Sequence, residues 1–331
     1  MSAHSGSKAV VAALLANLGI ALIKFIAFLL TGSSSMLAES VHSLADSGNQ
    51  GLLLLGGRQS RRQATAEHPF GYGRERYIYA FIVAIVLFSV GGLFALYEGY
   101  HKLQHPEPIE SWKWVPIVVL VSAILMESFS FRTAIVEANH VRGSQSWVSF
   151  IRRAKAPELP VVLLEDFAAL VGLVLALVGV SLTLLTDDGV WDGIGTVCIG
   201  VLLVCIAVVL AIETKSLLLG EGADRDTVRL LEAALMADPA VGRVVHMRTL
   251  HLGPDELLVA AKVAVTSDDT AAEVVRAIDA AEARIREAVP IARVIYLEPD
   301  LWSAERAAEA TTGPPSGVTR GSRENSGPGS R

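Results

Sequence analysis

The sequence is poor in charged residues. Asp, Glu, Lys and Arg make up 19% of its 331 residues, whereas a soluble domain carries about 25%. Hydrophobic residues make up 52%, and the mean hydropathy is +0.46. These values exclude a disordered or collagen-like chain and argue against a soluble enzyme. The 34 acidic residues outnumber the 28 basic ones, so no excess of positive charge favours nucleic acid as the main partner.

Cysteine is almost absent. Cys198 and Cys205 lie in one apolar run, about 10 Å apart if that run is helical. That distance is too long for a disulfide bond, which excludes a disulfide-held scaffold. The first apolar run is preceded by one basic residue, Lys8, and no cleavage motif of the A-x-A type follows it. We therefore interpret it as a membrane span and not as a cleaved signal peptide.

Long apolar runs are abundant. A helix that crosses a bilayer needs roughly 20 apolar residues. The sequence contains six such runs, at about 9–30, 36–57, 78–100, 114–138, 158–185 and 191–212. The second is the least apolar, because it holds several polar and charged side chains. We predict an α-helical membrane protein with six transmembrane helices.

The basic residues of the loops predict an orientation. Five Lys or Arg lie in the loop 58–77 and four lie in 139–157, whereas 31–35 and 186–192 contain none. Cytoplasmic loops carry the excess of Lys and Arg. We therefore expect a multi-pass protein of the cell membrane with both termini in the cytoplasm.

The pattern changes after residue 213. A helical apolar pattern near 225–237 is followed by two strand-like runs, a second helix near 270–288 and a last strand near 291–298. Ser267, Asp268 and Asp269 offer caps for the second helix. This α-β-β-α-β order predicts a small cytosolic α+β domain. The expected division is a transport domain at 1–212, a linker at 213–223, the α+β domain at 224–300 and a disordered tail at 301–331.

Ionisable side chains inside the apolar runs are the strongest functional signal. Each costs about 2.5–3.5 kcal/mol at the centre of a bilayer if it is charged and unpaired. His42 and Asp46 are four residues apart, so they lie on one helix face and offer a nitrogen and a carboxylate to one point. Such a pair suits a divalent transition metal, with zinc favoured. Glu165 and Asp166 are adjacent and point about 100° apart, so one ion cannot easily take both. A packing hydrogen bond remains the alternative for each of these groups.

Three stretches together resemble the cation diffusion facilitator family. They are Gly32–Ser47 (GSSSMLAESVHSLADS), Asn17 with Lys24 in the first run, and His68–Arg74 (HPFGYGR) before the third. Six spans followed by a short cytosolic α+β domain also match, and the resemblance covers about residues 8–300. It implies a homodimeric antiporter that exports zinc and related divalent cations in exchange for protons. The acidic doublet and Val162 resemble the branch of zinc transporter nine.

The resemblance also implies the ligands. In this family, pairs of ligands four residues apart on the second and fifth spans form the transport site. Carried over, they are His42, Asp46 and Asp166, while Val162 stands where a fourth ligand is usual. Glu165, Asn17 and Glu39 are the possible replacements.

Secondary metal sites of the family are only partly matched. In the loop site His68 is kept, but Tyr72 replaces a second histidine. In the cytosolic domain His246 and Glu298 stand at ligand positions, with His251 nearby on the same strand. We expect dimerisation to be the main role of that domain.

The expected function is export of divalent metal from the cytoplasm, with no enzymatic activity and no organic cofactor. Zinc is favoured over manganese, iron, cobalt and cadmium. The partners are the metal ion, protons, the lipid bilayer and a second copy of the chain. A metal sensor or regulator that does not transport remains the alternative. A membrane-embedded metallohydrolase is disfavoured, because no protease-type motif such as HExxH is present.

Overall fold

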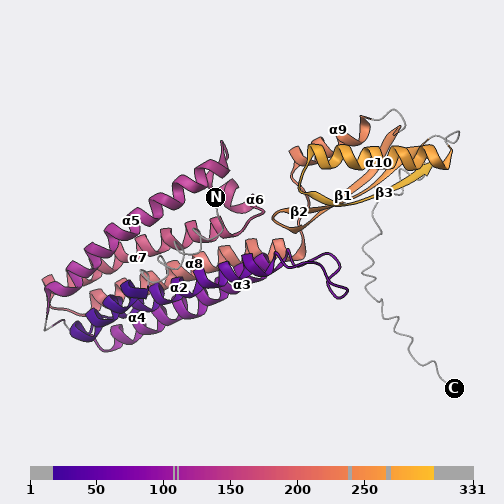
Figure 1. Cartoon of the computed structure of the whole chain (residues 1–331). Coiled ribbons are helices and arrows are strands. Elements are labelled where there is room, and N and C mark those ends of the chain that lie inside the picture. The colour runs from indigo at the N-terminus through magenta and orange to yellow at the C-terminus, as the bar shows by residue number, and fades with distance from the viewer. Residues whose placement is uncertain (1–17, 107–108, 110–111, 238–240, 266–269, 302–331) are drawn as a thin grey trace, which may run out of the picture. The chain divides into compact units, whose positions relative to one another are not determined.

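A computed structural model describes residues 18–106, 109, 112–237, 241–265 and 270–301 (Figure 1). The chain divides into two compact units. The first comprises residues 1–221 and 251–256, and the second comprises 222–250 and 257–331. The predicted Asn17 and nearly all of the predicted tail at 301–331 lie outside the described residues.

The first unit is a helix bundle. Its helices are an initial segment Leu18–Thr31, α2 (Ser34–Gln59), α3 (Glu75–Val86), the π-helix η1 (Leu87–Leu93), α4 (Phe94–Gln104), α5 (Trp114–Arg142), the short α6 (Trp147–Arg153), α7 (Glu158–Thr186) and α8 (Val190–Leu219). Four helices of the described part are long and apolar enough to cross a membrane: Glu75–Gln104, Trp114–Arg142, Glu158–Thr186 and Val190–Leu219. These four correspond to the third to sixth predicted spans. The full count of six remains a prediction.

The two remaining predicted spans differ from these four in different ways. Leu18–Thr31 is apolar but short, because the residues before it are not described. α2 is 26 residues long, yet its Ser, Glu, His, Asp and Asn side chains lower its hydropathy. Most of those polar side chains are buried inside the bundle rather than exposed. α2 begins after Ser33, whose hydroxyl caps the helix by accepting from the Met36 backbone N–H.

The third span is one continuous helix with a π-helical segment in its middle. α3, η1 and α4 follow each other without a break, and η1 contains Gly91 and Gly92. Single π-turns inside helices are frequent at functional sites. Both α4 and η1 pack on α8, where Gly200 faces the backbone of Leu96 so closely that an added Cβ would lie 2.7 Å from its nitrogen. Glycine therefore permits the close approach of these helices.

α7 packs between α5 and α8 and also contacts α2 (Figure 1). The buried core of the bundle comes from all of these helices, with Leu87, Leu120, Leu173 and Leu203 among its completely buried members. α8 continues to Leu219, seven residues beyond the predicted end of the span at 212. After the polar stretch Glu213–Ser216, the apolar residues Leu217–Leu219 carry the helix into the region expected as a linker.

The second unit is a three-stranded sheet with two helices. Its elements are α9 (Arg225–Met236), β1 (Arg243–Gly253), β2 (Glu256–Val265), α10 (Ala271–Ala288) and β3 (Ala292–Leu301). The strand order is β1-β2-β3, and β2 and β3 are parallel, with Val259 opposite Ile295. The predicted α-β-β-α-β order is confirmed. α10 is capped by Thr270, which forms a reciprocal capping box with Glu273, while the predicted caps Ser267–Asp269 lie outside the described residues.

Candidate functional site

His42 and Asp46 lie on the inner face of α2. The His42 ring is almost completely buried, and its Nε2 atom lies 3.5 Å from Asp46 Oδ2. Within the described part of the chain, neither ring nitrogen of His42 makes a hydrogen bond, and Asp46 Oδ1 makes none either. Buried polar atoms are normally hydrogen-bonded, so these three atoms without a hydrogen bond on one helix face need an explanation. One explanation is that they bind a cation.

The π-turn of the third span faces the histidine. A Cβ added to Gly91 would lie 3.9 Å from His42 Nδ1 and 3.3 Å from Leu203 Cδ1. The missing side chain leaves this side of the ring open to the backbone of η1. Hydropathy could not reveal the π-turn, and the adjacent glycines Gly91 and Gly92 are its only trace in the sequence.

The acidic doublet of α7 points in two directions. Glu165 is buried and accepts a hydrogen bond of 2.7 Å from Asn49 Nδ2 of α2. Asp166 instead accepts a bond of 3.0 Å from Ser130 Oγ of α5. The divergence follows from the 100° rotation between neighbours on a helix. Glu165 thus joins α7 to α2, and Asp166 joins α7 to α5.

These carboxylates nevertheless share one electrostatic environment. Asp46 interacts with Asp166, and Glu165 interacts with both of them. Glu127 of α5 adds a fourth carboxylate that interacts with Asp166 and Asp46. Among the described residues, however, no three His, Cys, Asp or Glu side chains lie close enough together to hold one ion. One imidazole and four carboxylates therefore surround a common region without forming a finished cage.

Glu39, one of the possible extra ligands, already has a cationic partner. Its Oε2 atom lies 3.1 Å from Lys24 Nζ, which also donates a 2.7 Å hydrogen bond to Ser43 Oγ. Both members of this ion pair are buried. The other oxygen of Glu39 faces α7, because a Cβ added to Gly172 would lie 2.9 Å from it. Lys24 thus places a fixed positive charge one helical turn from His42.

The other predicted residues each have surroundings of their own. Val162 of α7 is half-buried among hydrophobic neighbours of the core. His68 is exposed and its ring lies 4.7 Å from that of Tyr72. In the second unit Glu298 pairs with Lys262 at 3.0 Å, while His246 Nδ1 is buried without a hydrogen bond in the described structure. His251 is buried, and its Nδ1 lies 3.4 Å from the carbonyl oxygen of Gly253.

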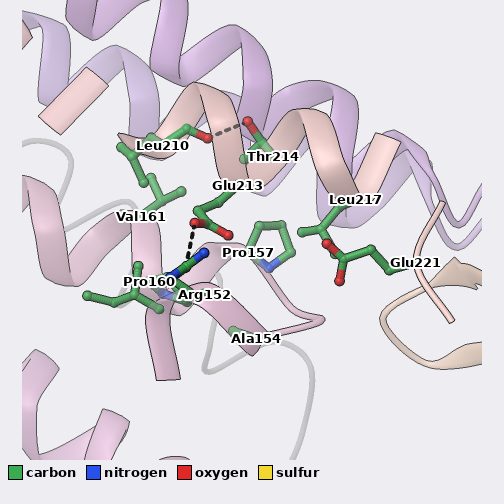
Figure 2. Close-up of a pocket in the computed structure, with 11 residues that line it drawn as sticks. Arg152, Ala154, Pro157, Pro160, Val161, Leu210, Glu213, Thr214, Leu217 and Glu221 are labelled. Carbon is green, nitrogen blue, oxygen red and sulfur yellow. Dashed lines mark hydrogen bonds and ion pairs between the residues drawn. The ribbon is translucent and has the colours of Figure 1, made fainter. Parts of the chain in front are cut away.

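The bundle also contains a small pocket between α6, α7 and the end of α8 (Figure 2). Its volume is about 20 Å³, which is room for about one water molecule. Arg152 and Glu213 line it and form an ion pair at 3.7 Å. The pocket is too small for an organic ligand.

Comparison with known proteins identifies the family. The profile described as "Cation efflux transmembrane domain" matches residues 10–219. The chain belongs to the cation efflux family. It is therefore a membrane protein of a family of cation transporters, as the sequence motifs predicted.

Several named proteins are similar to the chain. The "Proton-coupled zinc antiporter SLC30A9, mitochondrial" is 34% identical in Xenopus laevis over 72% of this chain and 43% of that protein. The human protein of the same name is 33% identical over 70% of this chain and 41% of its own length. "Metal tolerance protein C4" of Arabidopsis thaliana is 30% identical over 76% of this chain and 55% of its own length. The chain thus spans about half, or less, of the length of these relatives.

Proposed function

We propose that the protein is a secondary active transporter that moves zinc out of the cytoplasm in exchange for protons. The observation that carries the proposal is the buried His42 beside the half-buried Asp46: both ring nitrogens and Asp46 Oδ1 lack a hydrogen bond in the described structure, and the pair shares its surroundings with the carboxylates of α7. Mixed nitrogen and oxygen ligands suit zinc better than magnesium or calcium. The similar proteins of Xenopus laevis and human are named as proton-coupled zinc antiporters, which agrees with zinc and with coupling to protons. Manganese, iron, cobalt and cadmium are the competing substrates.

Coupling to protons follows from the chemistry of the ligands. A divalent ion needs a neutral imidazole and ionised carboxylates, so its binding displaces protons from these groups. One region can then hold either the metal or the protons. If the region opens alternately to each side of the membrane, protons that move inward drive the metal outward.

Binding of the ion would complete the cage. The ligands come from two helices, with His42 and Asp46 on α2 and Asp166 on α7. Glu165 points about 100° away from Asp166, so it can take the place left by Val162 only if α7 rotates when the ion binds. Glu165 is held by Asn49 at 2.7 Å, so an amide hydrogen bond already brings α2 and α7 together beside the ligands. An ion that attracts all four groups would stabilise the conformation in which they converge, which is the differential affinity that a conformational change requires.

The remaining assignments complete the proposal. Residues 1–212 form the transport domain, and 224–300 form a cytosolic domain for dimerisation or regulation. The compact second unit with its own apolar core supports this division. The distribution of Lys and Arg supports cytoplasmic termini in the cell membrane. The similar zinc antiporters are named as mitochondrial, so fractionation of tagged protein is the direct test of location.

Transport in proteoliposomes tests the function. Wild-type protein with an imposed proton gradient should accumulate zinc and release protons in return. His42→Ala and Asp46→Asn should each abolish both fluxes. His140→Ala is the matched control, because His140 is exposed on α5 and its ring bonds only to the Val136 carbonyl. Zinc binding without flux in the wild type would instead indicate a sensor, and full flux in both site variants would remove these residues from the mechanism.

A further inference from the structure

A buried carboxylate lies at the opposite end of α2 from the acidic doublet. Asp192 stands in the first turn of α8 and is completely buried. The three serines at the start of α2 surround it. Its Oδ1 accepts from Ser33 Oγ at 3.1 Å and from the Ser35 N–H at 3.3 Å, and its Oδ2 accepts from the Ser34 N–H at 2.8 Å and from Ser34 Oγ at 3.1 Å.

The charge of Asp192 is stabilised by two helices at once. The first N–H groups of a helix lack partners within the helix and carry a partial positive charge. Asp192 lies at the start of α8 and binds the free N–H groups at the start of α2. Hydrogen bonds to a charged acceptor are about twice as strong as neutral ones. The four bonds therefore fasten the end of α2 to α8 without a disulfide or a basic residue.

Further hydrogen bonds hold the backbone of Asp192 in place. The Asp192 backbone N–H donates to Thr183 Oγ1 of α7 at 3.0 Å. The Thr196 hydroxyl donates to the Asp192 carbonyl at 2.8 Å and also lies within 3.1 Å of the Ser34 and Ser35 hydroxyls. Ser35 Oγ donates to the same carbonyl at 3.2 Å. The network thus joins α2, α7 and α8.

The N–H groups of Ser34 and Ser35 bind different oxygens of Asp192, so together they fix the rotation of α2 as well as its distance from α8. A slip of α2 by one residue would move it about 1.5 Å along its axis and about 100° around it. A rotation of α2 about its axis without that slide would carry the Ser34 and Ser35 N–H groups away from Asp192, break both backbone bonds and turn His42 and Asp46 away from α7. His42 lies eight residues after Ser34, about 12 Å along the same rigid helix. The orientation set at Asp192 is therefore transmitted to the ligands.

We propose that Asp192 is a positioning residue for the transport site. Its carboxylate sets the rotation and axial position of α2 on α8, and thereby aims His42 and Asp46 at α7. The proposal about the ligands rests on the proposed function, whereas the orientation of α2 can be tested without it.

The full-length protein with Asp192→Asn provides the test. The amide presents an N–H₂ group where the carboxylate accepted hydrogen bonds. We expect zinc affinity, measured by calorimetry on the folded fraction, to fall about tenfold, and the KM for zinc in proteoliposomes to rise in parallel. Asp192→Glu keeps the charge and should recover part of the loss. Thr214→Ala is the matched control, because Thr214 is buried on the same helix and bonds only to carbonyls of its own helix (Figure 2).

A distance measurement separates positioning from stability. Spin labels at Leu44 and Phe167, exposed residues of α2 and α7, report the orientation of α2 in a background without Cys198 and Cys205. Asp192→Asn should shift or broaden the distance distribution, and Thr214→Ala should leave it unchanged. If Asp192→Asn does not fold, Ser34→Ala removes two hydroxyl bonds only and should give the same changes at about threefold in affinity. An unchanged distribution together with an unchanged zinc affinity overturns the proposal. A shifted distribution in a protein whose wild type binds no zinc supports the orientation of α2 and refutes the proposed function alone.

Discussion

The buried ion pair between Lys24 and Glu39 makes a strong prediction about stability. The two side chains are 4% and 0% exposed, and their charged atoms are 3.1 Å apart. Lys24→Met keeps the length of the side chain and removes the ammonium group. Glu39 then stays buried with no cationic partner, and its contact with α7 at Gly172 leaves it little room to move. Removing one member of a buried pair costs about 3–5 kcal/mol.

The corresponding change in melting temperature is measurable. At about 2–4 °C per kcal/mol for a unit of this size, Lys24→Met should lower the melting temperature by about 6–20 °C. Glu39→Gln should have a similar effect, because it leaves the ammonium with only Ser43. The double variant removes both charges and leaves one imperfectly bonded amide, at a cost of about 1–3 kcal/mol. It should therefore be more stable than either single variant.

Thermal unfolding in detergent, followed by light scattering and intrinsic fluorescence, measures all four proteins of this cycle. The exposed pair of Lys113 and Asp187 is the control, with 2.9 Å between charged atoms and side chains 50% and 72% exposed. An exposed pair contributes about 0–1 kcal/mol, so Lys113→Met should barely change the melting temperature. A melting temperature of Lys24→Met within about 2 °C of the wild type corresponds to a loss of about 1 kcal/mol or less. Such a result, or a double variant less stable than both single variants, would mean that the buried pair does not exist in the folded protein.

Two further predictions concern helix packing and pH. Gly200→Ala should destabilise the protein by about 1–3 kcal/mol, because its Cβ would lie 2.7 Å from the Leu96 backbone nitrogen, whereas Gly57→Ala, with nothing within 4 Å, should be neutral or stabilising in the same melting assay. Burial alone would raise the pKa of Glu221, but hydrogen bonds from Lys155 and Ser216 and the charge of Lys155 outweigh it and lower that pKa. A lowered folded-state pKa stabilises the protein above the unfolded value near 4.5 and stops doing so as pH falls through the folded value. The stability difference between wild type and Lys155→Met should therefore be full at pH 7 and shrink below about pH 4.5, and a difference independent of pH would contradict it.

Much of the fold follows from hydropathy and capping patterns. The four apolar spans and the α-β-β-α-β order were predicted because apolar runs and alternation reflect burial directly. The start of α10 was predicted to within a residue, at about 270 against Ala271, but the cap was assigned to Ser267–Asp269, although the capping box of Thr270 and Glu273 is readable as Thr-x-x-Glu. Helix ends depend on a few hydrogen bonds, and several neighbouring polar residues could have supplied them.

The partners within the site were harder to predict. The i, i+4 spacing places His42 and Asp46 on one face, but it does not show that Gly91 of a π-turn faces the ring. α7 is apolar on almost every side, so its periodicity could not decide that Glu165 turns to α2 and Asp166 to α5. The bonds of Asp192 to Ser33–Ser35 join residues about 160 positions apart, for which a single sequence carries no local signal.

The polar residues of α2 explain why hydropathy alone undervalues this helix. Ser35, Glu39, His42, Asp46 and Asn49 recur at intervals of four and three, which places them along one face. This face is turned inward: Ser35 meets Asp192, Glu39 meets Lys24, His42 faces Gly91 and Asn49 bonds Glu165. At 26 residues α2 is about 39 Å long, enough to cross the hydrocarbon core of about 30 Å. A hydropathy average counts each inward polar group as a cost, although its partner lies inside the bundle. The low mean hydropathy of α2 therefore reflects the many polar residues on its inward face, and it does not indicate that α2 contacts water.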